Sequence, residues 1–315
     1  MKKGLILVAL LIISVSVPLL LGCGEECGTC DEVVTFPDPY LEEEIREAIG
    51  KSGCDICKAD LADLTKLSVS DSQIADLTGL EHCTNLKGLW LHWTMLSDIS
   101  PIAELHNLTQ LQLAHSRITD ISPLTGLVNL ESLSLTDNRI SDISSLTNLT
   151  ALKRMWLGAN KIKDISPVSG LVNLTVLDLS ANEIEDVSCI EDLKSLTNLR
   201  LSGNHISDIS PLAHITSLEE LGLSNNQIVD LSPLSKLTNL EMLFLGYNEI
   251  EDISPLSNLK NIYDITLNNN LITDLEPLLE NPGIEIVDVS DNPLSQTSIN
   301  VYIPQLEKRG VEVDW

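Results

Sequence analysis

The sequence has 315 residues, enough for one large domain or two small ones. Hydrophobic residues make up 43% of the chain but aromatic residues only 3%, so the core must be built from aliphatic side chains. There are 19 lysines and arginines against 46 aspartates and glutamates, a formal net charge of −27. This balance argues against nucleic acid as a partner and favours solubility or cationic partners.

The N-terminal segment has the pattern of an export signal. Two lysines after Met1 precede an uncharged run that ends at Leu21 and is, on length alone, borderline for a membrane-spanning helix. The letters LLGC at residues 20–23 resemble the lipobox of bacterial lipoproteins. The resemblance implies cleavage before Cys23 and lipid addition to that residue, with an uncleaved anchor or plain secretion as alternatives. We therefore expect an extracytoplasmic, lipid-anchored protein on the outer face of a bacterial membrane or on the cell surface.

Residues 64–295 repeat with a period of 22 residues. The shared pattern is L-x-x-L-x-L-x-x-N-x-I-x-D-I-S-P-L-x-x-L-x-N, and position 1 denotes its first Leu. There are ten complete copies without insertion, and a partial copy begins at Ile284. The complete copies begin at Leu64, Leu86, Leu108, Leu130, Leu152, Leu174, Leu196, Leu218, Leu240 and Ile262.

The spacing within one copy predicts its local structure. Leu at positions 4 and 6 alternates with polar residues at 3, 5 and 7, which is the period of a half-buried strand. Asn at position 9 can donate to and accept from backbone groups where the strand turns. Ser-Pro at positions 15 and 16 is typical of a helix start, with Ser as N-cap and Pro as the first helical residue. Few residues remain before the next strand, so we expect a short 3₁₀ turn. Stacked copies then share one aliphatic core behind a parallel sheet.

The pattern is that of leucine-rich repeats, and the 22-residue version with D-I-S-P-L resembles the internalin type. The resemblance covers about residues 36–315. It implies an α/β-type solenoid, a right-handed superhelix with the parallel sheet on its concave face, short 3₁₀ helices on its convex face and a helical N-cap. It also implies protein partners, with adhesion as one role.

The chain outside the repeats divides into four short segments. Residues 1–22 are the expected lipoprotein signal peptide, and residues 23–35 are an acidic tether. Residues 36–63 contain an amphipathic helix that we expect to cap the first repeat. Residues 296–315 form the C-terminal cap, with a polar helix start and a final strand.

One aspartate recurs at position 13 of every complete copy. A calcium ladder is one interpretation, but calcium takes six to eight oxygens and each copy offers a single carboxylate between aliphatic residues. We therefore expect each carboxylate to accept backbone N–H groups in its own turn. The column is Asp76, Asp98, Asp120, Asp142, Asp164, Asp186, Asp208, Asp230, Asp252 and Asp274.

Four cysteines near the N-terminus form two C-x-x-C pairs, Cys27 with Cys30 and Cys54 with Cys57. In a cytosolic chain this spacing would indicate zinc, whereas export favours disulfides. Disulfides, a structural zinc and free thiols all stay open. A disulfide or a metal would fasten the tether to the N-terminal cap, and zinc at this place is the one cofactor that the sequence suggests.

The sequence carries no G-x-S-x-G, P-loop or H-E-x-x-H motif. His92 and His115 fall near the strand ends of adjacent copies, and Asp137 follows in the next copy. They could form a metal or acid–base site, but a solvated polar face is the simpler interpretation. We expect no enzyme.

Aromatic residues inside the repeats avoid the leucine positions, so their rings should project from the concave sheet or border it. A scattered exposed ring needs no explanation, but an exposed Trp is typical of binding hot spots. We therefore predict that the N-terminal half of the concave face is a ligand-binding site. The predicted ligand-binding residues are Trp90, His92, Trp93, His115, Arg154, Trp156, Phe244 and Tyr247.

The sequence favours a lipid-anchored, monomeric surface protein that recognises a protein, peptide or glycan with its concave face. A passive envelope spacer without a specific ligand is the main alternative. A metal-dependent enzyme using His92 and His115 is a third.

Overall fold

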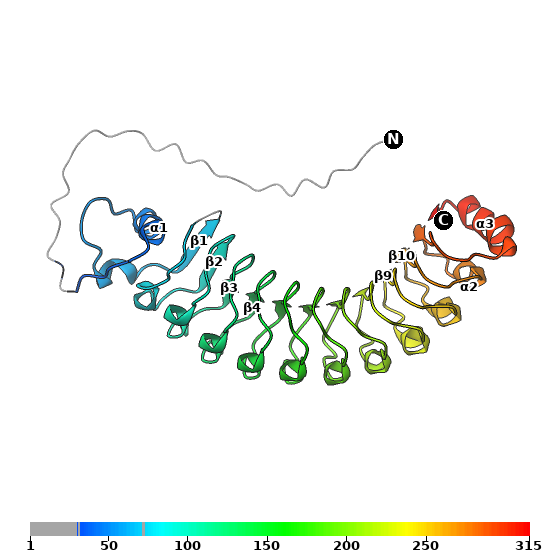
Figure 1. Cartoon of the computed structure of the whole chain (residues 1–315), viewed down its shortest axis with the longest axis horizontal. Helices are drawn as coiled ribbons and strands as arrows, with labels where there is room; N and C mark the ends of the chain where they lie inside the picture. Colours follow the sequence, from blue (N-terminus) through cyan, green and yellow to red (C-terminus); the bar gives the residue numbers. More distant parts are fainter. Residues whose placement is uncertain (1–29, 31, 71–72) are drawn as a thin grey trace, which may run out of the picture.

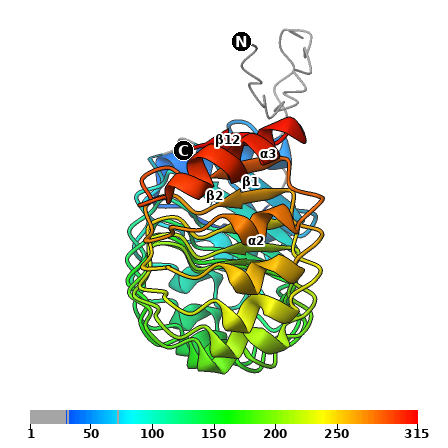
Figure 2. The same cartoon turned by 90° about the vertical axis from the view of Figure 1, so that its right-hand side faces the viewer.

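The computed structural model describes residues 30, 32–70 and 73–315. Twelve parallel strands form one open sheet in sequence order, which lines the inner side of an arc, with short helical turns on its outer side (Figure 1). Seen from the C-terminal end, the repeats stack one behind another (Figure 2). This confirms the predicted solenoid. The strands are β1 (Lys66–Ser70), β2 (Gly88–His92), β3 (Gln110–Gln112), β4 (Ser132–Ser134), β5 (Arg154–Trp156), β6 (Val176–Asp178), β7 (Asn198–Arg200), β8 (Glu220–Gly222), β9 (Met242–Phe244), β10 (Asp264–Thr266), β11 (Ile286–Asp288) and β12 (Glu312–Asp314).

The strands pair in the register that the 22-residue period predicts. Leu111 of β3 lies opposite Leu133 of β4, and Leu133 lies opposite Met155 of β5. All three side chains are fully buried, and they belong to one aliphatic core that runs the length of the solenoid. No single repeat can bury its leucines alone, so each repeat depends on its neighbours for stability.

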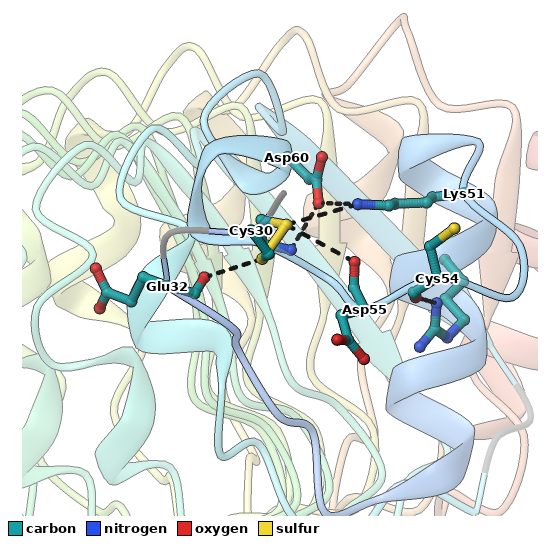
Figure 3. The surroundings of a disulfide bond; sticks show 8 residues. Cys30, Glu32, Lys51, Cys54, Asp55 and Asp60 are labelled. Atoms are coloured by element: carbon teal, nitrogen blue, oxygen red, sulfur yellow. Dashed lines mark hydrogen bonds and ion pairs between the residues drawn. A yellow bond between two sulfur atoms is a disulfide. The ribbon is translucent and has the colours of Figure 1, made fainter. Parts of the chain in front are cut away.

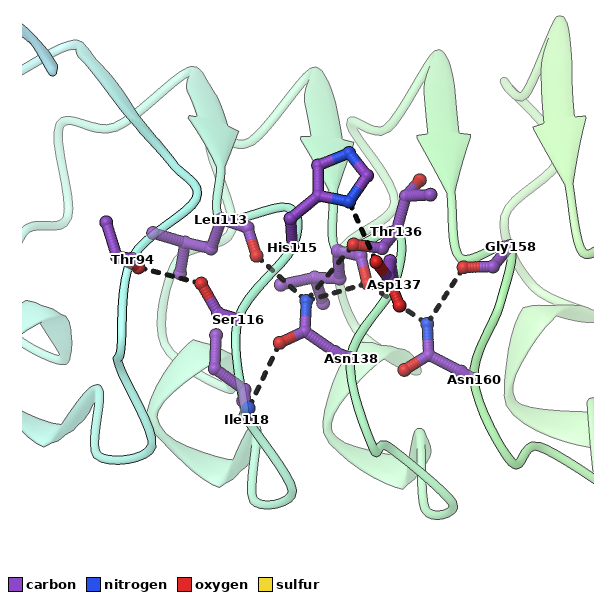
Figure 4. Close-up of polar contacts among 11 residues, drawn as sticks. Thr94, Leu113, His115, Ser116, Ile118, Thr136, Asp137, Asn138, Gly158 and Asn160 are labelled. Carbon is purple, nitrogen blue, oxygen red and sulfur yellow. Dashed lines mark hydrogen bonds and ion pairs between the residues drawn. The ribbon is translucent and has the colours of Figure 1, made fainter. Parts of the chain in front are cut away.

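Asn at position 9 joins neighbouring turns, as the sequence predicts. The Asn138 side chain accepts the backbone N–H of Ile118 at 3.0 Å and donates to the carbonyls of Leu113 at 2.8 Å and Leu135 at 3.0 Å (Figure 4). It therefore satisfies backbone groups of two successive repeats where the strands end. The same ladder continues through Asn160, Asn182, Asn204, Asn226, Asn248, Asn270 and Asn292.

The aspartates at position 13 have the predicted structural role. Each accepts the backbone N–H two residues ahead at 2.7–3.0 Å, as Asp120 does from Ser122. The predicted N-cap role of Ser is wrong. Ser122 is already the first residue of its 3₁₀ turn, the N-cap is Ile121, and Pro follows in second place. The carboxylate of Asp120 therefore does the capping from outside the turn.

One 3₁₀ turn precedes β1, and the others follow the strands at regular intervals on the outer side of the arc (Figure 1). They are η1 (Lys58–Leu61), η2 (Leu80–His82), η3 (Ser100–Ile102), η4 (Ser122–Leu124), η5 (Ser144–Leu146), η6 (Ser166–Val168), η7 (Ser188–Ile190), η8 (Ser210–His214), η9 (Ser232–Lys236) and η10 (Ser254–Asn258), and the one-turn helix α2 (Glu276–Leu279) takes the same place in the tenth repeat.

Helix α1 (Pro39–Ile49) covers the first repeat. Asp38 caps its N-terminus, and the second oxygen of that carboxylate accepts the backbone N–H groups of Ala75 at 2.8 Å and Asp76 at 3.2 Å. One buried side chain thus ties the helix start to the first turn of the solenoid. Gly50 ends the helix at φ 67°, in the left-handed region that glycine favours.

The C-terminal cap consists of a π-helical turn, η11 (Ser298–Tyr302), followed by α3 (Ile303–Lys308) and β12. The hydroxyl of the fully buried Ser298 donates to the carbonyl of Thr273 and accepts the N–H of Leu275. Ile303 and Leu306 cover the last leucine layer. Within the described residues, no helix is both long enough and apolar enough to cross a membrane.

Candidate ligand-binding face

The outward-facing side chains of the sheet divide by charge. In β1 to β5 no strand residue is acidic, and Lys66, His92 and Arg154 are the groups that can carry positive charge. In a chain with a net charge of −27, the described strands of the N-terminal half of the concave face are therefore free of acidic residues. In β6 to β12 the acidic strand residues are Asp178, Glu220, Asp264, Asp288, Glu312 and Asp314.

Trp90 lies half-buried in the middle of β2. Its ring folds over Gly88 on the same strand, because a Cβ built on Gly88 would lie 2.1 Å from the ring atom Cη2. The ring therefore covers the outer face of the sheet, and the buried layer beneath it consists of Leu89 and Leu91. This placement agrees with the expectation that the ring is outside the core.

Trp93 stands just beyond the end of β2, at position 8 of its repeat. It is 58% exposed, and its φ of 58° places it in the left-handed region, which is costly for a bulky residue. The same position is left-handed in the following repeats, mostly with Asp, Asn, Ala or Gly. The sequence therefore puts a large ring where the backbone favours a small or short polar residue.

His115 supports this exposed ring. It occupies position 8 of the next repeat, and its imidazole stacks on Trp93 with 3.9 Å between ring centroids and 3° between planes. Its Nδ1 lies 2.8 Å from Oδ2 of Asp137, which occupies the same position one repeat further (Figure 4). Below this row the position-9 residues Thr94 and Ser116 replace the asparagine and bond to each other at 2.7 Å.

His92 lies at the end of β2, partly buried on the same face. Burial lowers its pKa, and a hydrogen bond with Gln112 opposes that shift. The neutral form is thereby favoured, so His92 offers one donor and one acceptor rather than a charge.

Trp156 and Arg154 lie together on β5, where the ring is half-buried and the arginine exposed. Trp90 and Trp156 are three strands apart, or about 14 Å at the usual strand spacing. The structure thus brings Trp93, His115 and Asp137 into contact, and places Trp156 and Arg154 as a separate pair along the sheet.

Phe244 and Tyr247 lie farther away, at β9 and just beyond it. Phe244 is four strands from Trp156, about 19 Å, so these two residues do not join the N-terminal group. Tyr247 is 56% exposed and left-handed at φ 58°, like Trp93.

A hollow of about 560 Å³ opens beside Phe244, and its charged residues are absent from the predicted set. Glu220 is only 9% exposed in its side chain, and its oxygens accept hydrogen bonds from Arg200 Nε and Asn198 Nδ2, both at 2.8 Å. The bond to Glu220 raises the pKa of the Arg200 guanidinium. The signal in the sequence is Gly222, a missing side chain between two large ones in the position-5 column.

The cysteines near the N-terminus bring the start of the described chain onto the cap. Cys30 and Cys57 form a disulfide (Figure 3). Val33 pairs with Cys57 in an antiparallel bridge, and Lys51 binds the Asp60 carboxylate beside it at 2.6 Å. Cys23 and Cys27 lie outside the described residues, so the lipidation site and the role of Cys27 stay predictions. Within the described ranges, no three His, Cys, Asp or Glu side chains are grouped as metal ligands.

Two further cysteines are free thiols away from this face. Cys83 is fully buried, and burial raises its pKa to about 12. Cys189 takes the proline position of its repeat, and burial raises its pKa to about 11. Both thiols are therefore protonated at neutral pH and poor nucleophiles.

Comparison with known proteins agrees with this geometry. The "Leucine Rich repeats (2 copies)" profile matches seven overlapping segments: 106–148, 128–171, 150–194, 172–214, 194–236, 216–258 and 238–280. No curated protein matches the chain in sequence.

Solved structures supply closer likenesses. An internalin (InlF) of Listeria monocytogenes is 32% identical, with a TM-score of 0.77 over 88% of each chain. Internalin C2 of the same species is 31% identical, with a TM-score of 0.59 over 76% of this chain and 100% of that one. A leucine-rich-repeat protein of Leptospira interrogans is 25% identical, with a TM-score of 0.69 over 81% of this chain and 73% of that one.

Internalin-like proteins are typically surface or secreted bacterial proteins, and leucine-rich-repeat domains generally bind proteins rather than catalyse reactions. The repeats, the curved sheet and these likenesses together show that the chain belongs to the leucine-rich-repeat family, as an internalin-type member.

Proposed function

We propose that this protein is a lipid-anchored bacterial surface receptor, not an enzyme, that recognises a protein, peptide or glycan with the N-terminal half of its concave face. The observation that carries the proposal is Trp93, a widely exposed ring held at a costly backbone conformation and supported by His115. The repeats that follow share this backbone conformation at position 8, so the distinguishing feature of Trp93 is the bulky, exposed ring placed there.

The charge of the surrounding strands supports the same half of the sheet. Apart from Asp178, which pairs with Trp156 on the next strand, the strand residues beside Trp90 and Trp156 are neutral or basic, while the chain as a whole is strongly acidic. An acidic partner therefore meets less repulsion over β1 to β5 than over β6 to β12, although Asp137 and Asp178 lie at the border of this region. We propose that the protein acts as a monomer.

The test is to capture partners with the membrane-anchored protein and to measure their affinity for single-site variants. Trp93→Ala should weaken binding about 30-fold, since a tryptophan hot spot contributes about 2 kcal/mol. Trp90→Ala and Trp156→Ala should act in the same direction without lowering the melting temperature. Trp315→Ala is the matched control, because Trp315 is similarly exposed, at 55%, but lies at the far end of the chain. Equal affinity of all four variants would show that the aromatic groups are incidental and favour the passive spacer.

The lipid anchor has a separate test. Cys23→Ser should stop processing and leave an unlipidated precursor. The precursor would be detected by its higher protein mass and by the loss of labelling with a fatty-acid probe. Normal labelling of that variant would contradict the proposed anchor without touching the binding proposal.

A further inference from the structure

Three consecutive strands carry Arg200, Gly222 and Phe244 at the same outward position. Gly222 has no side chain, so a gap separates the side chains of β7 and β9, which are two strand spacings or about 9.6 Å apart. The hollow of about 560 Å³ lies in this gap, and Ser202, Ser224 and Met242 also line it. Its volume is within the range of pockets that bind small ligands.

One wall of the hollow is a fixed, charge-balanced pair. The buried Glu220 carboxylate accepts a hydrogen bond from Arg200 Nε, and its second oxygen is held by Asn198. Because Nε is the atom engaged, the planar guanidinium is anchored at its base, with its charge offset by Glu220. The Arg200 stem passes 3.8 Å from the place a Gly222 Cβ would occupy, so it borders the floor of the hollow.

The lining favours one chemical class of occupant. A guanidinium attracts the face of an aromatic ring, the Phe244 ring packs against another ring in an offset or edge-on manner, and the Met242 thioether makes favourable contacts with ring edges. An aliphatic side chain would gain none of these interactions beyond its buried area. A carboxylate would be attracted by Arg200 but repelled by Glu220 in the hollow and by Asp178 and Asp264 on the strands beside it.

We propose that this hollow is a second subsite of the concave face and that it takes one aromatic side chain of a polypeptide partner, tyrosine in preference to phenylalanine. The hydroxyls of Ser202 and Ser224 supply partners for a phenol that phenylalanine lacks. This inference rests on the proposed function, since it makes that partner a polypeptide. Trp156 on β5 is three strands from Gly222 on β8, about 14 Å, a span that an extended chain of about four residues covers.

The test uses the full chain and three small probes: N-acetyl-tyrosinamide, N-acetyl-phenylalaninamide and N-acetyl-leucinamide. Titrations followed by backbone amide NMR should show the tyrosine probe shifting the Ser224 signal at the lowest concentration and the leucine probe shifting it least. Gly222→Val should raise the dissociation constant for the tyrosine probe at Ser224 by about tenfold or more, because it fills the floor. Ser134→Val, the same outward position on β4, is the matched control and should change nothing at Ser224.

Folding is not the expected cause of the loss. A Cβ at Gly222 would approach only the Ser202 hydroxyl closely, at 3.2 Å, and that side chain can rotate away. Arg200→Lys is the second variant. It keeps the charge but removes the planar group, so it should also raise the dissociation constant of the tyrosine probe. Equal binding of all three probes, or an unchanged dissociation constant in both variants, would overturn the aromatic subsite.

The partner separates this inference from the proposed function. A partner whose affinity falls with Trp93→Ala but not with Gly222→Val would overturn the second subsite and leave the binding face intact. If the tyrosine probe binds at Ser224 while no Trp variant affects partner binding, the subsite is supported and the proposed N-terminal binding face is overturned.

Discussion

The ring of Trp93 lies parallel to the ring of His115, with 3.9 Å between their centroids. His115 in turn lies within hydrogen-bonding distance of Asp137. These three residues occupy position 8 of three successive repeats and form a row along the edge of the sheet. The indole is thus braced on one face by the imidazole and stays 58% exposed. A ligand that contacts the exposed part of this ring meets a side chain whose orientation is already set, which lowers the entropic cost of binding.

His115→Ala should release Trp93 without unfolding the protein. The imidazole is outside the leucine core, so the melting temperature should stay within about 2 °C of the wild type. The indole N–H of Trp93 should show a lower NMR order parameter, while that of Trp156 should be unchanged. An equally rigid Trp93 indole in the variant would show that the stack does not brace it.

The disulfide between Cys30 and Cys57 should stabilise the N-terminal cap. It closes a loop with a sequence separation of 27, for which the loss of chain entropy in the unfolded state corresponds to about 3.5 kcal/mol. The double variant Cys30→Ser, Cys57→Ser should therefore unfold at lower denaturant concentration, first around α1 as seen by hydrogen exchange. Unchanged exchange in α1 would mean that packing alone holds the cap.

The asparagine ladder should be more important for stability than its exposed counterpart at position 22. Asn204 is buried and its amide donates to the carbonyls of Leu179 and Leu201. Asn204→Ala leaves the buried N–H of Ile184 without its partner, at about 1–3 kcal/mol, while the two carbonyls keep one donor each, from Asn182 and Asn226. Asn173→Ala, which removes one exposed bond to Thr150, should cost less than about 1 kcal/mol in a denaturant titration. Similar losses in the two variants would contradict a special role for the buried ladder.

Ser145 is a position at which a substitution should raise the stability of the fold. It takes the position that is Pro in most repeats, and its buried hydroxyl has no hydrogen-bond partner among the described residues. Ser145→Pro removes that unsatisfied group and stiffens the unfolded chain, so it should raise stability by about 1 kcal/mol. Ser141→Pro, outside the proline column, is the control and should not. A lower melting temperature for Ser145→Pro would show that the 3₁₀ turn of this repeat differs from its neighbours.

The aspartate column should make stability fall in acid. Hydrogen bonds from the backbone and side chain of Ser232 lower the pKa of Asp230 below its ordinary value of 3.8. A lowered pKa in the folded state means that the stabilisation is complete above pH 3.8 and is lost as the pH falls through the folded-state value. Asp230→Asn keeps an acceptor but cannot titrate, so its unfolding free energy should depend less on pH below about 4. Glu251→Gln removes an equal exposed charge and serves as the control.

Much of the fold follows from the repeat, because a fixed period sets both the strand register and the buried face. Leu133 and Leu135 alternate with Ser134 as a half-buried strand requires, and the structure places them accordingly. The N-cap was predicted wrongly because a Ser-Pro pair indicates that a helix starts nearby but does not identify the residue at which it starts. Here Asp120 already binds the N–H of Ser122, so the turn begins one residue earlier.

The candidate site was only partly predictable. Position in the repeat shows that Trp90 and Trp156 are outside the core, but not that His115 stacks on Trp93, because that contact depends on side-chain rotamers in a left-handed turn. Glu220 looks like an ordinary exposed acid in the sequence. It is buried because Arg200 and Asn198 on the neighbouring strand hydrogen-bond to it, and the pattern of leucines does not predict these contacts.

Because the sheet adds one strand per repeat and never closes, the number of repeats sets the distance between any two points on the concave face. Removing the 22 residues 174–195, one whole repeat, would bring Trp156 and the Gly222 hollow closer by one strand spacing, about 4.8 Å, while leaving the residues of each intact. Gain or loss of whole repeats therefore changes the distance between the two sites without altering the residues of either. A partner of the shortened or lengthened protein would need side chains with a correspondingly different spacing.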